Sequence, residues 1–130
     1  MKKLGIIGAM TVEVDTLKSL MQDLQVTQRA GMEFYEGSLN GASVVVVRSG
    51  IGKVNAALCV QILVDLFEVT HIINTGVAGG AGSVAGILDV VVAEKIAYHD
   101  VWCGMGCEYG QVQGMPTIFP SAEELWQQVR

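Results

Sequence analysis

Apolar and polar positions in the first part of the chain alternate between strand-like and helix-like spacing. Residues 3–9 form a β-branched run bounded by glycines, which predicts a first strand. Thr11 then offers a side-chain oxygen for a helix N-cap. The apolar residues that follow recur at helical spacing: Val14, Leu17, Leu20, Met21 and Leu24. The pattern predicts a strand, a tight loop and a helix that carries this stripe.

Two further strand-like runs, residues 33–39 and 43–48, flank the dipeptide Asn40-Gly41. Asn-Gly supplies the positive φ angles of a type I′ turn, so these runs predict an antiparallel hairpin. A second helix is predicted by apolar residues at helical spacing, namely Val54, Ala57, Leu58, Ile62 and Leu66. Residues 70–75 then predict another strand.

The remaining pattern completes an alternation of strands and helices. A glycine-rich stretch, residues 76–82, ends the preceding strand, and residues 89–98 predict a long strand that is apolar on both faces at first. Strands of this kind occur where helices cover both sides of a sheet. We therefore expect an α/β fold with a mixed sheet, in one domain over residues 1–130.

The end of the chain has the pattern of a capping box, Ser121-Ala122-Glu123-Glu124, which predicts a helix through Leu125, Trp126 and Val129. No C-cap signal precedes Arg130. We expect a chain cut from a longer protein, with an ordinary short terminal helix as the alternative.

Composition narrows the class of partner. Hydrophobic residues make up 51% and charged residues 16%, which is typical of a folded chain with buried strands. A net charge of −5 argues against a nucleic-acid partner, and the apolar runs are too short to span a membrane. The odd number of cysteines, 3, gives no disulfide framework, which favours a reducing compartment and hence the cytoplasm.

Glu13 is the strongest candidate for chemistry. It lies in the first turn of the first predicted helix, near a strand end where open α/β sheets place ligands. Most carboxylates at such positions only complement the helix dipole, so both interpretations remain open. The glycine loop at 76–82 follows another strand end, and its glycines allow the backbone to approach a flat ligand closely.

A zinc site is the second candidate considered, because His99, Cys103 and Cys107 are spaced by four. The spacing places them together only on a helix, and Gly104 and Gly106 disfavour a helix there. We favour a loop histidine with two packed thiols, and no metal.

Five segments in order resemble the 5′-methylthioadenosine/S-adenosylhomocysteine nucleosidases of the nucleoside phosphorylase-like superfamily. They are Gly5-Ile6-Ile7-Gly8-Ala9-Met10 with Glu13-Val14, then residues 49–57 (SGIGKVNAA), residues 73–80 (INTGVAGG), Tyr98-His99-Asp100, and Glu108-Tyr109-Gly110-Gln111. Each segment is weak alone, but the ordered set covers essentially the whole chain.

The resemblance implies a nucleoside phosphorylase-like fold, a homodimer, and hydrolysis of an adenine nucleoside to adenine and a thioribose in methionine salvage, without metal or organic cofactor. It implies that Glu13 activates water and that Ala9 and Met10 line the water and ribose region. The site residues it implies for the purine are Val77, Ala78 and Gly79. Ile51 and part of residues 101–116 would contribute to the interface or to the neighbouring subunit's thioalkyl pocket.

Two residues depart from the family pattern. Val77 replaces a serine beside the purine, and Leu88 replaces a glycine before Asp89. In the family, an aspartate in the carboxy-terminal portion serves the leaving purine, and this chain has no equivalent segment. We therefore expect the 130 residues alone to be inactive.

Two other functions remain as alternatives. A purine nucleoside phosphorylase of the same fold needs cations to hold phosphate, whereas residues 8–16 contain no Lys or Arg and offer Glu13 and Asp15, which would repel it. The second alternative is a non-catalytic fragment that retains the dimer and purine-cleft surfaces.

Overall fold

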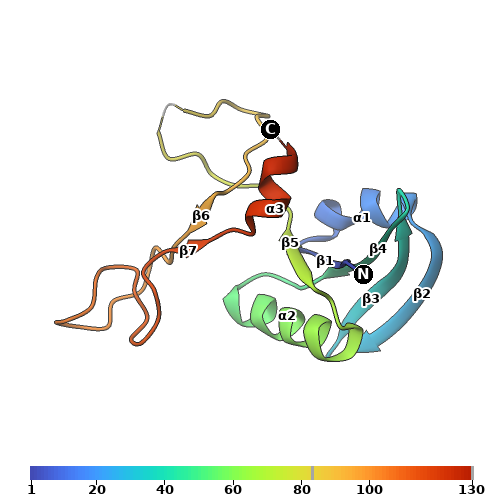
Figure 1. Ribbon diagram of the computed structural model, residues 1–130, viewed down its shortest axis with the longest axis horizontal. Coiled ribbons are helices and arrows are strands. Elements are labelled where there is room, and N and C mark those ends of the chain that lie inside the picture. The colour runs from blue at the N-terminus through green and yellow to red at the C-terminus, as the bar shows by residue number, and fades with distance from the viewer. Residues whose placement is uncertain (83, 130) are drawn as a thin grey trace. The chain divides into compact units, whose positions relative to one another are not determined.

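The computed structural model describes residues 1–82 and 84–129 of the chain. Its residues group into two compact units, Met1–Gly79 and Gly80–Arg130, which are described separately (Figure 1). Whether they belong to one domain, as expected from the sequence, stays a prediction. Within the described ranges, no helix combines the length and apolar character needed to cross a membrane.

Residues 1–79, all of which the structure describes, form one five-stranded sheet in the order β2-β3-β4-β1-β5. Its strands are β1 (Lys3–Gly8), β2 (Gln22–Arg29), β3 (Met32–Leu39), β4 (Ala42–Arg48) and β5 (His71–Asn74). Strand β1 pairs in parallel with β4 and β5, while β3 is antiparallel to both β2 and β4. The predicted α/β class with a mixed sheet is confirmed.

The hairpin between β3 and β4 follows its sequence signal. Asn40 and Gly41 have φ angles of 49° and 81°, the left-handed values that this turn needs. Leu39 pairs directly with Ala42 across the turn. The predicted hairpin is therefore confirmed.

Helices α1 (Thr11–Leu20) and α2 (Lys53–Phe67) cover opposite faces of the sheet (Figure 1). The valines at 44–47 of β4 are all buried, and they alternate between the two faces. Val44 and Val46 pack with Val14 of α1, whereas Val45 and Val47 pack in the cluster that holds three residues of α2: Cys59, Leu63 and Phe67. Burial on both faces explains why this strand is continuously apolar.

Three details of the first unit differ from the expectations. Helix α1 begins at Thr11, so Met10 and not Thr11 is at the N-cap. The helix ends at Leu20, and Leu24 belongs to β2, which the sequence did not predict. The reason is that β2 is a mostly exposed edge strand without a buried apolar face, so in the sequence Met21 and Leu24 continue the helical spacing of α1.

The buried face of α2 also differs from the predicted stripe. Ile62 of the predicted stripe packs against the core, but Val54, Leu58 and Leu66 are 75%, 50% and 46% exposed. The buried core residues of α2 are Cys59, Leu63 and Phe67. Helix α2 is apolar around most of its circumference, so spacing alone does not identify the face that packs on the sheet. The exposed apolar residues of α2 are not packed on the sheet of this unit.

The second unit has short elements: β6 (Lys95–Ile96) pairs with β7 (Phe119–Pro120), and α3 (Glu123–Trp126) continues into the 3₁₀ turn η1 (Gln127–Val129). The long strand predicted over residues 89–98 is wrong except at 95–96, because the described chain provides no paired strand for the rest. Val90 is 88% exposed. The helix near the end exists, but Ala122 takes the N-cap and Ser121 does not cap it.

Candidate active site

The carboxyl ends of three neighbouring strands bring the candidate loops to one edge of the sheet. Ile7 of β1 pairs with Asn74 of β5, and Thr75 donates its N–H to the Ile7 carbonyl at 2.9 Å. On the other side of β1, the N–H of Ser49 donates to the Gly8 carbonyl at 2.9 Å. The loops after β1, β4 and β5 therefore leave the sheet together, where open α/β sheets bind ligands.

The Glu13 carboxylate links two of these loops. Its Oε2 accepts a hydrogen bond from the N–H of Met10 at 2.9 Å, and its Oε1 accepts one from the N–H of Val77 at 3.1 Å. The first contact is local to the start of α1, and the second crosses to the loop that follows β5. Glu13 is thus fixed in orientation, which a residue that only complements a helix dipole does not require.

The same contacts set the charge of Glu13. Hydrogen bonds from the N–H groups of Met10 and Val77 lower the pKa of the carboxyl below its ordinary value, with a smaller contribution from Ala9. Glu13 is therefore a carboxylate at neutral pH. Its side chain is only half-buried, so the charge remains accessible to a ligand.

Gly76 leaves the space that the carboxylate occupies. A Cβ added at Gly76 would lie 2.8 Å from Cδ of Glu13 and 3.2 Å from Oε2, and it would collide with Oε1. Gly8 has a similar role, because a Cβ there would lie 2.7 Å from Cγ1 of Val14 and 3.0 Å from Cβ of Glu13. The sequence identified this glycine loop as a place of close approach, but did not show that Gly76 makes room for Glu13.

The other predicted site residues lie on the same loops. Ala9 is half-buried, and Met10 is 36% exposed beside Glu13. Val77 contributes its N–H to Glu13 and exposes 82% of its surface, and Ala78 and Gly79 are exposed. Ile51 is 74% exposed on the loop after β4. The structure brings Met10, Glu13 and Val77 into direct contact, and the ligand-binding roles of the full set stay predictions.

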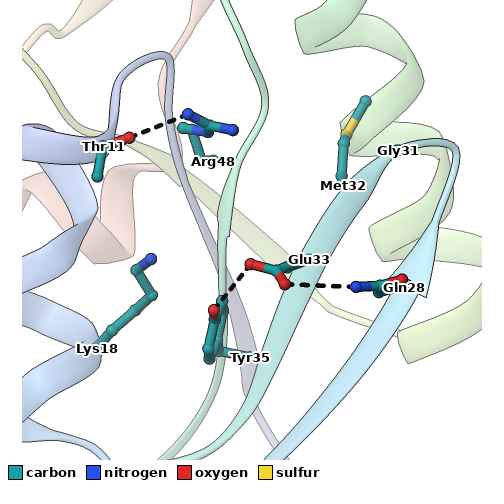
Figure 2. A pocket seen from close by; sticks show the side chains of 8 residues that line it. All are labelled: Thr11, Lys18, Gln28, Gly31, Met32, Glu33, Tyr35 and Arg48. Carbon is teal, nitrogen blue, oxygen red and sulfur yellow. Dashed lines mark hydrogen bonds between the residues drawn. The ribbon is translucent and has the colours of Figure 1, made fainter.

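Arg48 is a neighbour that the sequence did not reveal. It ends β4, and its Nη1 donates to Oγ1 of Thr11 at 3.0 Å (Figure 2). The cavity beside it measures about 390 Å³ and lies within the first unit. Residues that line it include Lys18, Glu33 and Tyr35. Residues 8–16 themselves contain no Lys or Arg, but strand pairing brings this arginine to the first turn of α1.

The polar groups around this cavity are paired with one another. Lys18 makes an ion pair of 2.9 Å with Asp15 and lies over the Tyr35 ring at 4.6 Å. The Tyr35 hydroxyl donates to Glu33 at 2.9 Å, and this bond raises the pKa of Tyr35. Figure 2 shows Lys18, Tyr35 and Glu33 together with Arg48 and Thr11 around this cavity. The arrangement is a self-contained network.

The zinc candidates in the second unit lie outside any helix. His99, Cys103 and Cys107 belong to a segment of turns, so their spacing by four does not place them on a common helical face. Across the described ranges, no group of three or more His, Cys, Asp or Glu side chains is arranged to hold a metal.

Comparison with known proteins identifies the family to which this fold belongs. A model of the phosphorylase superfamily matches residues 3–130. The chain belongs to this superfamily. Among similar superfamily proteins, the 5′-methylthioadenosine/S-adenosylhomocysteine nucleosidase of Colwellia psychrerythraea is 45% identical over 124 residues, 95% of this chain and 51% of that protein. The nucleosidase of Geobacillus sp. is also 45% identical, over 95% of this chain and 53% of that protein.

Solved structures of similar nucleosidases have the same fold over nearly the whole of this chain. The Colwellia nucleosidase in complex with adenine matches with a TM-score of 0.94 at 44% identity, covering 97% of this chain and 52% of that one. The Streptococcus pneumoniae nucleosidase with a transition-state inhibitor gives a TM-score of 0.94 at 40% identity, covering 98% and 56%. The resemblance predicted from the motifs is confirmed. The chain spans about half the length of the relatives it matches.

Proposed function

We propose that the protein carrying this chain hydrolyses the N-glycosidic bond of 5′-methylthioadenosine and S-adenosylhomocysteine, releasing adenine and the thioribose. The observation that supports this most is the Glu13 carboxylate, held between Met10 and Val77 at the carboxyl ends of β1 and β5. The names of the nucleosidases that this chain resembles at 45% identity support the same substrates.

In the proposed mechanism, Glu13 acts on water. Cleavage of the glycosidic bond produces an oxocarbenium-like ribose, and a carboxylate near C1′ both stabilises this charge and takes a proton from the attacking water. The two backbone N–H groups keep Glu13 ionised and in one orientation. Adenine leaves with a proton, which a group outside these 130 residues supplies in the proposal.

We assign the remaining site residues by their place on the three loops. Ala9 and Met10, which immediately precede α1, line the water and ribose region, and Ile51 contributes to the thioalkyl side or the interface. Val77, Ala78 and Gly79 lie against the purine. Their exposure supports this assignment. Ala9 is half-buried, Met10 is 36% exposed, and the other four residues are exposed.

We further propose a cytoplasmic homodimer that functions in methionine salvage. The exposed apolar surface of α2 and the loop before it supports dimer formation, because Ile51, Val54 and Leu58 are each at least half exposed. The 130 residues alone are proposed to release no adenine, because the nucleosidases they resemble are about twice as long. On the 130-residue chain, light scattering tests self-association and an adenine-release assay tests the absence of activity.

Arg48 favours one alternative, a nucleoside phosphorylase. Phosphorylases hold a phosphate dianion, and a guanidinium within reach of the first turn of α1 is a suitable partner for it. Against this, Glu13 and Asp15 lie in the same turn, and their negative charges repel phosphate. Water therefore remains the proposed nucleophile.

Product analysis distinguishes the two reactions. A hybrid in which this chain replaces the matching part of the Colwellia nucleosidase supplies the remaining residues. With methylthioadenosine in phosphate-free buffer, the proposal predicts adenine and free methylthioribose, at rates that added phosphate leaves unchanged. If a sugar 1-phosphate formed, and only when phosphate is present, the reaction would be phosphorolysis and the proposed hydrolysis would be wrong.

A further inference from the structure

The three cysteines of the chain occupy two different environments. Cys59 of α2 is fully buried in the core cluster with Phe34 and Leu63, and burial raises the pKa of its thiol to about 11. Cys103 is exposed and Cys107 is half-buried, both in the second unit. Only this second pair is open to reagents dissolved in water.

A closed loop contains both Cys103 and Cys107. The N–H of Gly110 donates to the Val101 carbonyl at 2.9 Å and closes residues 101–110. Inside this loop, the N–H of Cys107 donates to the Gly104 carbonyl at 3.3 Å. Such a four-residue turn holds its end Cα atoms within about 7 Å. Cys107 is one end of the turn, and Cys103 is bonded to the other.

Two glycines give the turn its tight path. Gly104 and Gly106 have φ angles of 89° and 95°, which side chains rarely adopt. The chain therefore reverses direction between the two cysteines. Bridged cysteines usually have Cα atoms about 4.4–6.8 Å apart. The turn keeps Cys107 within about 7 Å of Gly104, the residue bonded to Cys103.

We propose that Cys103 and Cys107 form a reversible disulfide by exchange with a low-molecular-weight disulfide such as oxidised glutathione. The Cys103 thiolate attacks one glutathione sulfur, which forms a mixed disulfide and releases one glutathione thiolate. The Cys107 thiolate then attacks Sγ of Cys103 and releases the second. The two thiols lose two protons and two electrons, and oxidised glutathione is reduced to two molecules of glutathione.

This bond is a modification, not a structural framework. An exposed disulfide that closes a short loop is readily reduced, so excess glutathione returns the two thiols. The inference does not use the chemistry of Glu13. It rests on the geometry of residues 101–110 and on the burial of Cys59 in this chain.

Trypsin separates the cysteines for the test. Lys53 and Lys95 are consecutive cleavage sites, so residues 54–95 carry Cys59, and the peptide from residue 96 onward carries both Cys103 and Cys107. The 130-residue chain is treated with oxidised glutathione at about pH 8, where free thiols are partly ionised. It is then alkylated and digested, and the peptide masses are measured by mass spectrometry. The proposal predicts that the peptide from residue 96 loses about 2 Da and escapes alkylation, and that reduced glutathione reverses this.

Variants distinguish the internal bond from other products. Cys107→Ser keeps the attacking thiol and is expected to accumulate the glutathione adduct on Cys103. Gly104→Ala disfavours the turn and lowers the ratio of internal to mixed disulfide by about fivefold or more. Met105→Ala is the matched control, since Met105 is fully exposed between the two glycines and its change leaves the ratio unaltered.

Three results would overturn the inference. They are a stable glutathione adduct on the wild-type chain without the internal bond, a disulfide that joins two chains or involves Cys59, and full alkylation of Cys103 and Cys107 after oxidation.

Discussion

Replacement of Gly76 by alanine should displace the Glu13 carboxylate while leaving the rest of the fold in place. The added Cβ would lie 2.8 Å from Cδ of Glu13, whereas ordinary contacts begin at 3.4 Å. The carboxylate must therefore move by at least 0.6 Å (3.4 − 2.8). The hydrogen bond from the N–H of Val77, directly after the substitution, is the one expected to break.

The displacement has two measurable effects. In the hybrid enzyme, we expect turnover to fall by roughly 10–100-fold, since a misplacement of about 1 Å at a reacting group costs on the order of 10²-fold. In the 130-residue chain, the pKa of Glu13 should rise toward its ordinary value of 4.5, because a hydrogen bond that stabilises the carboxylate is lost. Carbon-detected NMR titration of the side-chain carboxyl measures this pKa directly.

Gly80→Ala is the matched control for the titration. Its Cβ would approach only the Ala85 carbonyl, at an ordinary 3.9 Å, so the pKa of Glu13 should stay low. Circular dichroism of each variant separates local displacement from unfolding. If Gly76→Ala folds normally and changes neither the Glu13 pKa nor turnover, the close approach of this loop to Glu13 is not part of the site.

Three further predictions follow from single residues. Val77→Ser should be tolerated in the hybrid and strengthen adenine-nucleoside binding by about 0.5–1.5 kcal/mol, the value of one hydrogen bond. Calorimetry measures this binding, and its loss in the variant would contradict the placement of the 76–80 loop beside the ligand. Leu88, which replaces the family glycine, has a φ angle of 71° and is 94% exposed. Leu88→Gly should therefore raise the free energy of unfolding in urea by about 1 kcal/mol. Leu88→Ala is the control and should change it little. Because the folded-state pKa of Glu13 is lowered, its contribution to stability is present above the unfolded value of 4.5 and is lost as pH falls through the folded pKa. The difference in unfolding free energy between the wild type and Glu13→Gln should therefore be larger at about pH 7 than at about pH 3, and equal differences at the two pH values would exclude this coupling.

Much of the first unit could be predicted from the sequence because its signals are local and strong. The Asn40-Gly41 turn, the valine run of β4 and the helical spacing after Lys53 each indicate one element, and all three elements are present. The edge strand β2 was missed because both of its faces are largely exposed, and its two apolar residues, Leu24 and Val26, form too short an alternation to indicate a strand. The packed face of α2 was missed because the helix is apolar on several sides.

Long-range features could not be predicted, because they depend on strand pairing. The contacts of Glu13 with Val77 and of Arg48 with Thr11 join residues 64 and 37 positions apart in sequence. The segment 89–98 shows the opposite failure, since its apolar pattern is strand-like but the described residues give most of it no partner. A strand depends on its neighbour as much as on its own residues.

Turnover of the hybrid enzyme with Glu13→Gln is the most direct test of the central claim. The carboxamide keeps the shape of the side chain but cannot accept the proton from water. With methylthioadenosine as substrate, we expect adenine release to fall by at least about 10²-fold, while nucleoside affinity stays within about tenfold. Turnover near that of the unsubstituted hybrid, in a variant that folds and binds normally, would remove Glu13 from the mechanism.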